Sequence, residues 1–193
     1  MSYATRITSE EMEGMEYAAF AGTIDVIENE GEAFDTAMDY LSSQPAIGFD
    51  TETKPCFIPK APRNKMAILQ LAGRQRAYIF RLHQIGVPQR LAKLLSNPKV
   101  IKIGAAVHDD IRGLNEYNNF RASGFVDLQK LAGEYGIEEK SVRKMAAIIL
   151  NRRVSKSQQL SNWESAVLSE AQLKYAAIDA WICLEMYEKL MRG

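Results

Sequence analysis

Several features of secreted, membrane-bound or cysteine-rich proteins are missing from this sequence. Cysteine occurs only at Cys56 and Cys183, which is too few for a disulfide framework or a cysteine metal site. No apolar run approaches the roughly 20 residues that a bilayer-spanning helix needs. The N-terminal residues also lack the basic-then-apolar order of a signal peptide. These absences predict a protein of a reducing compartment, the cytoplasm, without membrane contact.

Internal repeats, low-complexity tracts and linkers rich in proline or glycine are absent too. The 193 residues are enough for one well-buried domain and short for two. A content of 47% hydrophobic and 25% charged residues is ordinary for a globular protein. We expect a single domain over residues 22–193, preceded by an N-terminal extension over residues 1–21.

The formal net charge is zero, which argues against a uniformly basic nucleic-acid binder, but the charges are unevenly distributed. Residues 1–53 hold twelve acidic side chains and one basic, residues 54–108 hold eleven basic and none acidic, and residues 109–193 hold twelve of each. The basic block could form a local positive surface. Equally, the basic and acidic segments could pair in the fold and cancel, so composition leaves both interpretations open.

Apolar periodicity predicts strands alternating with helices. The expected strands lie at residues 22–29, 46–52, 66–73, 76–82 and 99–106, of which the third and fourth form a hairpin. The expected helices lie at residues 31–44, 87–98, 108–118, 127–136, 140–151 and 169–192. A loop rich in proline and basic residues is expected at 57–65. This order indicates an α/β domain with a mixed sheet and at least one parallel crossover.

Four acidic residues stand beside apolar stretches: Asp50, Glu52, Asp110 and Asp179. Asp50 and Glu52 follow a strand at a spacing of two, so their side chains point to the same face. Asp179 lies four residues after Tyr175, which places both on one helix face. Each acid alone could cap a turn or bond a neighbouring hydroxyl. One cause shared by all four is a divalent metal site, because Mg²⁺ prefers oxygen ligands.

Three sequence blocks carry a resemblance to a known family. They are the Asp-x-Glu pair in "FDTE", the block "KIGAAVHDDIRGL" with Leu114 four residues after Asp110, and "LKYAAIDA" with Tyr175 four residues before Asp179. Each block is weak alone, but the three in this order resemble the DEDD superfamily of 3′→5′ exonucleases, closest to ribonuclease D and Werner-type exonucleases. Tyr175, with Lys174 where the sister branch has histidine, indicates the DEDDy branch. The resemblance covers roughly residues 22–190.

The resemblance implies a ribonuclease-H-like fold with a five-stranded mixed sheet and helices on both faces. It also implies a metal-dependent 3′→5′ exonuclease that uses two Mg²⁺ or Mn²⁺ ions on DNA or RNA with a free 3′ end. Asp50 would bridge both ions, and Glu52 and Asp179 would hold the ion that binds the attacking water. Asp110, rather than its neighbour Asp109, would serve the second ion through water, and Tyr175 would orient the attacking water.

The same resemblance suggests which residues contact the substrate. Thr51 would approach the terminal nucleotide, and the apolar side chains of Phe57 and Leu69 would pack on bases. Lys156 would contact phosphate, and Trp163 is a further candidate for substrate contact. Core packing is an equally simple role for Phe57, Leu69 and Trp163, and a solvated face for Lys156.

Two other functions can be compared with the exonuclease. A catalytically inactive nucleic-acid-binding or adaptor module would be expected to have lost a carboxylate, and all four are present. A metal phosphatase with a D-x-D-x-T nucleophile is disfavoured, since "DTETK" has Glu52 at the third position. The sequence leaves the choice between DNA and RNA, and the oligomeric state, open.

Overall fold

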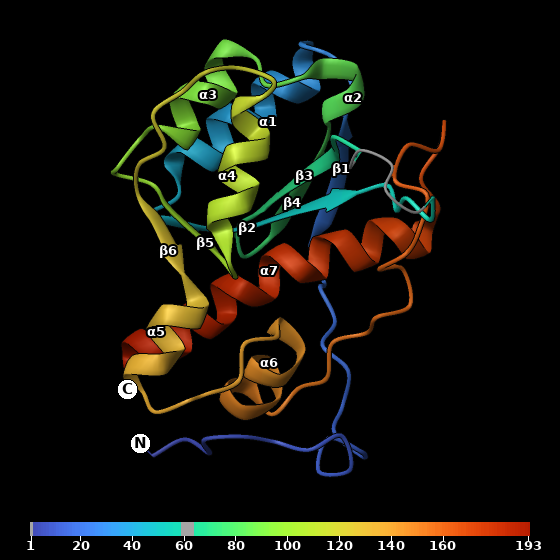
Figure 1. The fold of residues 1–193 in the computed structure, drawn as a ribbon. Coiled ribbons are helices and arrows are strands. Elements are labelled where there is room, and N and C mark those ends of the chain that lie inside the picture. The colour runs from blue at the N-terminus through green and yellow to red at the C-terminus, as the bar shows by residue number, and fades with distance from the viewer. Residues whose placement is uncertain (1, 59–63) are drawn as a thin grey trace.

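The computed structural model describes residues 2–58 and 64–193, so part of the loop expected at 57–65 lies outside the described residues. Its centre is a six-stranded sheet in the order β1-β4-β3-β2-β5-β6 (Figure 1). The strands are β1 (Thr23–Ile27), β2 (Ala46–Thr53), β3 (Met66–Ala72), β4 (Arg76–Arg81), β5 (Ile101–Gly104) and β6 (Phe125–Asp127).

The expected mixed sheet is confirmed, but its strand number was wrong. β3 is antiparallel to both β2 and β4, whereas β1 is parallel to β4 and β2, β5 and β6 run parallel to one another. The strand missed by the sequence is β6, which is only three residues long. Its last residue, Asp127, caps the following helix by accepting a hydrogen bond from the Gln129 backbone. Because Asp127 was interpreted as the start of a helix, the short strand that ends at this residue was not predicted.

Helices cover both faces of the sheet, as expected (Figure 1). One side carries α1 (Glu32–Ser43), α2 (Leu82–Ile85), α3 (Gln89–Leu95) and α4 (Val107–Asn115). The other carries α5 (Leu128–Glu134), α6 (Val142–Leu150) and the long α7 (Glu170–Arg192). Ser169 and Gln172 form a capping box at the start of α7. The four-residue α2 was not predicted, because so short a helix leaves no periodic pattern.

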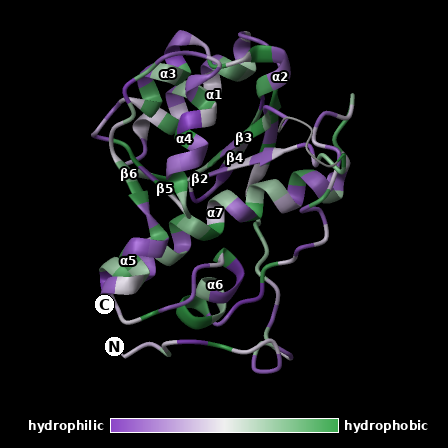
Figure 2. Cartoon of the chain, in the orientation of Figure 1, coloured by the Kyte–Doolittle hydropathy of each residue, from purple (hydrophilic) through white to green (hydrophobic). Residues whose placement is uncertain are grey.

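Side-chain alternation along β2 sorts its residues between the two helical layers. Ile47 and Phe49 are buried in the core cluster that includes α1 and α3. Gly48 faces α7, and a Cβ added there would collide with the carbonyl oxygen of Ala180. Asp50 and Glu52 continue the Gly48 side of the strand. In Figure 2 the hydrophobic colour extends along much of β3, the central neighbour of β2.

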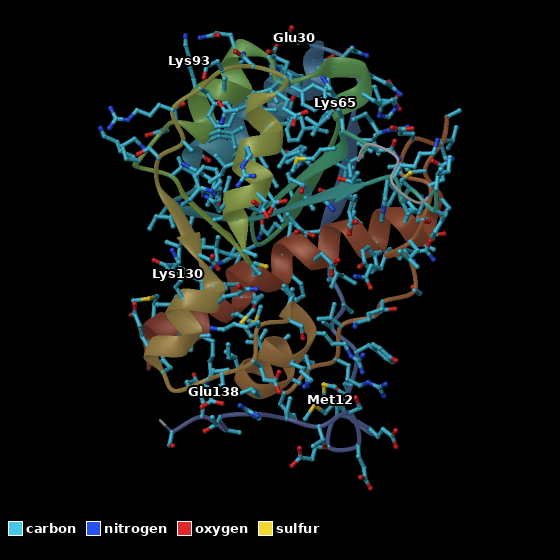
Figure 3. The ribbon with its side chains drawn as sticks, viewed as in Figure 1. Met12, Glu30, Lys65, Lys93, Lys130 and Glu138 are labelled. Atoms are coloured by element: carbon cyan, nitrogen blue, oxygen red, sulfur yellow. The ribbon has the colours of Figure 1, made fainter. Side chains whose placement is uncertain are left out.

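The N-terminal segment packs beside α6 on the side of the sheet that α7 covers. Met12, labelled in Figure 3, is 1% exposed and clusters with Ile7 and Ala147. Backbone hydrogen bonds join Ala18 N to Arg153 O at 2.8 Å and Arg153 N to Glu16 O at 2.9 Å. The segment is therefore tied to the chain that follows α6. Within the described residues, no helix combines the length and apolar character that crossing a membrane requires.

The close approach of α7 to β2 gives a stability prediction. Gly48→Ala should lower the free energy of unfolding by about 1–3 kcal/mol, because its methyl group overpacks the contact with Ala180. Urea unfolding followed by circular dichroism measures this change. Gly133→Ala is the matched control, since nothing lies within 4 Å of a Cβ at that helical position. Equal stabilities of the two variants would contradict close packing at Gly48.

Candidate metal centre

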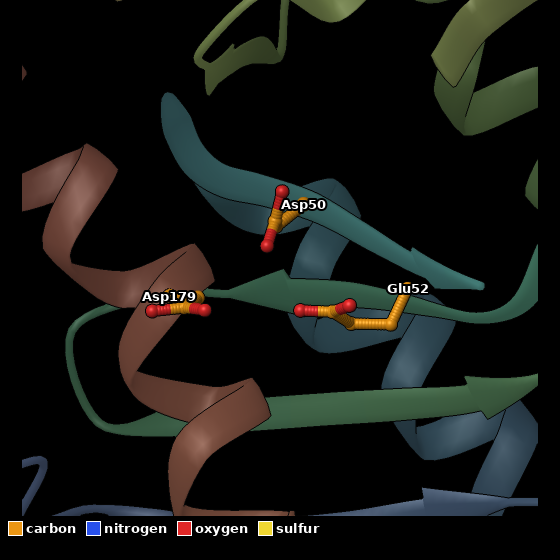
Figure 4. A group of neighbouring side chains, drawn as sticks. All are labelled: Asp50, Glu52 and Asp179. Carbon is orange, nitrogen blue, oxygen red and sulfur yellow. The ribbon is translucent and has the colours of Figure 1, made fainter. Parts of the chain in front are cut away.

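Three carboxylates meet where β2 runs past α7. Asp50 and Glu52 come from the strand and Asp179 from the helix, and one ligand oxygen of each lies within 4.8 Å of the others (Figure 4). Asp179 is only 8% exposed. Within the part of the chain that the structure describes, this is the one group of three or more metal-ligand side chains at such spacing. The structure thus brings together three of the four acids selected from the sequence.

Asp110 approaches from the other side of the sheet. It lies in the first turn of α4, and the Thr51 hydroxyl donates a 2.6 Å hydrogen bond to its Oδ1. Its negative charge helps to raise the pKa of both Asp50 and Glu52, so it lies beside the three carboxylates without joining their tight group. The neighbouring Asp109 has a side chain that is 79% exposed and pairs with Arg112 at 3.0 Å. Burial therefore favours Asp110 over Asp109 as the acid that belongs to the candidate metal site.

Burial and mutual repulsion make the ionised state of this group costly. Burial, with the charges of Asp179, Glu52 and Asp110, raises the pKa of Asp50 well above its usual range. Burial and neighbouring carboxylates raise the pKa of Glu52 to about 8. Burial raises the pKa of Asp179 to about 7, against an opposing effect of the Tyr175 hydroxyl.

No lysine or arginine among the described residues forms an ion pair with any of these four acids. A compact, desolvated set of oxygen ligands without a cationic partner has the donor chemistry that Mg²⁺ and Mn²⁺ prefer. The residues present therefore fit divalent cations, whose charge would offset the repulsion among the carboxylates.

Tyr175 lies one turn before Asp179 on α7, as its spacing predicted. Its ring packs against Trp163 at a centroid distance of 5.9 Å. Trp163 is 0% exposed, so the suggestion that it contacts substrate was wrong. Trp163 lies in the connector before α7. Its indole is buried in the core beside Ala176, and Tyr175 packs against the same cluster.

Leu69 was also wrongly assigned to base contact. It lies opposite Thr51 in the sheet and is 0% exposed. It packs with Phe49 and Leu71 in the core between the sheet and the helices α1 and α3. A base cannot reach a side chain with no accessible surface. Phe57, in contrast, is 76% exposed and remains a candidate for stacking.

Two adjoining hollows border the carboxylates. One, of about 340 Å³, is lined by Asp50, Glu52, Asp179 and Tyr175 together with Arg143 and Lys156. The other, of about 670 Å³, includes Asp110, Lys54 and Lys65, and the two share Thr51, Glu52 and Gln159. Sequence reasoning missed Arg143, because it lies in an amphipathic helix without a motif. Lys156, the sequence's candidate for a phosphate contact, lines the smaller hollow.

Comparison with known proteins identifies the family. Residues 24–193 match the family described as 3′-5′ exonuclease, and this match covers most of the chain. The chain belongs to the 3′-5′ exonuclease family. The resemblance drawn from the three sequence blocks is thereby confirmed.

Curated relatives of this exonuclease family align over about three quarters of the chain. Exonuclease 3′-5′ domain-containing protein 2 of Drosophila melanogaster is 34% identical over 150 residues, which is 76% of this chain and 25% of that protein. The bifunctional 3′-5′ exonuclease/ATP-dependent helicase WRN of Mus musculus is 31% identical over 156 residues, or 78% of this chain and 11% of that protein. The chain thus spans only a quarter or less of these relatives' lengths.

Solved structures of exonucleases share the fold. The Aedes aegypti Nibbler EXO domain superposes with a TM-score of 0.78 at 25% identity, covering 88% of this chain and 87% of that one. Escherichia coli RNase D superposes with a TM-score of 0.77 at 22% identity, covering 92% and 45% of the two chains. The α/β architecture is that of these exonuclease structures.

The raised carboxyl pKa values give a pH prediction for the exonuclease chain. The folded protein holds these protons more tightly than the unfolded chain, whose carboxyl pKa values lie near 4. The resulting stabilisation is complete below pH about 4 and is lost as pH rises through the folded pKa values of about 7 for Asp179 and about 8 for Glu52. Without metal, the melting temperature should therefore be lower at pH 8 than at pH 6.

Thermal unfolding at both pH values, with EDTA or Mn²⁺, measures this effect. Mn²⁺ should raise the melting temperature more at pH 8, because it competes with protons for the carboxylates. Asp50→Asn is the control: it removes one repelling charge, so its metal-free stability should exceed that of the wild type most at pH 8. A wild-type advantage at pH 8 without metal would contradict the electrostatic description.

Proposed function

We propose that this chain is a 3′→5′ exonuclease that hydrolyses the 3′-terminal phosphodiester bond of DNA or RNA and releases nucleoside 5′-monophosphates. Residues 22–193 would be the exonuclease domain and residues 1–21 an extension packed against it. The observation that carries the proposal is the carboxylate group of Asp50, Glu52 and Asp179 with Asp110 beside it. It occurs in a chain that matches the 3′-5′ exonuclease family over residues 24–193.

The carboxylates would hold two divalent cations, Mg²⁺ or Mn²⁺. Asp50 would contribute to both ions, Glu52 and Asp179 to the one nearer the attacking water, and Asp110 to the other through water. When bound, such ions lower the pKa of water and stabilise negative charge on the attacking and leaving oxygens. The hydrogen bond from the Thr51 hydroxyl restrains the side chain of Asp110, which supports this role.

Tyr175 would orient the attacking water. Burial and the neighbouring acids raise the pKa of its hydroxyl above its usual value, so the group stays protonated at neutral pH and can donate a hydrogen bond. Its ring is held against the buried Trp163. A rigid donor at the edge of the carboxylate group suits the alignment of a water molecule for attack.

The hollows beside the carboxylates would receive the end of the nucleic-acid strand. Arg143 and Lys156 are basic residues on the wall of the hollow that holds Asp50 and Asp179, where they would contact phosphate. Thr51 would lie next to the terminal nucleotide, and the exposed Phe57 would stack on a base. Discrimination between DNA and RNA would depend on contacts to the 2′-hydroxyl.

Digestion of 5′-labelled single strands tests this function. Wild-type protein with Mn²⁺ or Mg²⁺ should shorten DNA or RNA of the same sequence one nucleotide at a time. EDTA should stop the reaction, because the carboxylates alone cannot stabilise the developing charge. Asp50→Ala and Asp110→Ala should be inactive yet folded, since each removes a charge from a repelling group. A gel of the products, for both sugars in parallel, also reports the substrate preference.

Two variants sharpen the result. Asp109→Ala is the matched control for Asp110→Ala, because its exposed neighbouring carboxylate pairs only with Arg112 among the described residues. It should retain activity. Tyr175→Phe should bind Mn²⁺ as the wild type does but cleave about a hundredfold more slowly. Binding of oligonucleotides without cleavage under any metal would contradict the exonuclease and favour the inactive binding module.

A further inference from the structure

A buried amide next to the carboxylate group has no hydrogen-bond partner. The side chain of Gln70, in the middle of β3, is 0% exposed, and neither its Nε2 nor its Oε1 is bonded within the described residues. An amide offers two donor hydrogens and one acceptor oxygen. Leaving all of them unsatisfied in the interior is costly, and native proteins rarely do so without a reason.

The position of Gln70 places it beside Asp50. The two residues are direct partners in the antiparallel pairing of β2 with β3, and Gln70 faces Ile79 across the next strand. Cross-strand partners have Cβ atoms about 5 Å apart and point to the same face. Of the two cross-strand neighbours of Gln70, only Asp50 is polar. Its carboxylate lies within reach of the flexible glutamine side chain.

The neighbours of Gln70 on this face of β3 are apolar. Ile68 and Ala72, which share a face with Gln70 on β3, pack in clusters with Ala176, Ala177 and Ala180 of α7. An aliphatic residue at position 70 would continue this packing. Packing alone therefore does not account for an amide at position 70. A hydrogen-bond acceptor nearby does, and the carboxylate of Asp50 on the neighbouring strand is one.

We propose that Gln70 is a positioning residue for Asp50. When the site binds divalent cations, Nε2 of Gln70 donates a hydrogen bond to a carboxylate oxygen of Asp50 and fixes the orientation in which Asp50 serves both ions. A carboxylate has about four acceptor positions, so it can bind metal and accept this bond together. The inference rests on the proposed function, because it concerns the same site.

Calorimetric titration of the full chain with Mn²⁺ alone tests this role. Gln70→Met, which keeps the length and loses the amide, should weaken Mn²⁺ binding about tenfold or more, as is typical when the partner of a metal ligand is removed. Gln70→Leu should act likewise. Without metal, both variants should melt no lower than the wild type, since they remove an unsatisfied polar group. In digestion assays they should lower kcat and leave KM for the oligonucleotide unchanged.

Tyr78→Phe is the matched control. The Tyr78 hydroxyl is likewise buried without a partner in the described part of the chain, but its ring packs in the other core layer against Tyr40. Its removal should leave Mn²⁺ binding unchanged. Asp50→Ala should abolish Mn²⁺ binding, which shows that the titration reports the proposed site.

The outcomes separate the two claims. If Asp50→Ala loses Mn²⁺ binding and Gln70→Met binds as the wild type does, the positioning role is overturned and the metal site stands. If the wild type binds no Mn²⁺, both are overturned. If Gln70→Met and Gln70→Leu both unfold or melt well below the wild type without metal, the amide is structural and the positioning role is overturned.

Discussion

Repulsion among the carboxylates held between β2 and α7 is the constraint on which the rest of the structure depends. Asp50, Glu52 and Asp179 would separate if their backbones were free, because burial and like charge both oppose ionisation. They stay together because β2 is paired with β3 at both acids and α7 is packed directly against β2. The fold thus stores an electrostatic penalty that divalent cations would relieve, and this penalty is the physical reason for interpreting the group as a metal site.

The scaffold around the group follows from that constraint. Gly48 lets the backbone of α7 approach β2 closely enough for Asp179 to face Asp50. The long helix begins with a full capping box at Ser169, and its alanines allow tight packing on the sheet. From the opposite side, Asp110 reaches the same place and is held by Thr51. Residues from both helical layers therefore converge at one position on β2, where the two hollows share Thr51 and Glu52.

Much of this site could be predicted from the sequence, because local geometry determines it. A spacing of two in a strand and of four in a helix fixes which side chains share a face, so Asp50 with Glu52, and Tyr175 with Asp179, were predictable pairs. Exposure depends on tertiary packing instead: Leu69 and Trp163 are apolar residues near the motifs, yet both are fully buried. β6 was missed because three residues carry no period, and the isolation of the Gln70 amide exists only once the strands are paired.

A crystal structure grown with Mn²⁺ and measured near the manganese absorption edge tests the central claim most directly. Two anomalous peaks about 4 Å apart are expected, both within coordination distance of Asp50, with Glu52 and Asp179 on one ion and Asp110 near the other. The same map shows whether the metal-bound carboxylates have kept their places on β2 and α7. A map without a peak between β2 and α7, or with Mn²⁺ bound only by other residues, would contradict the assignment of these carboxylates as a two-metal centre.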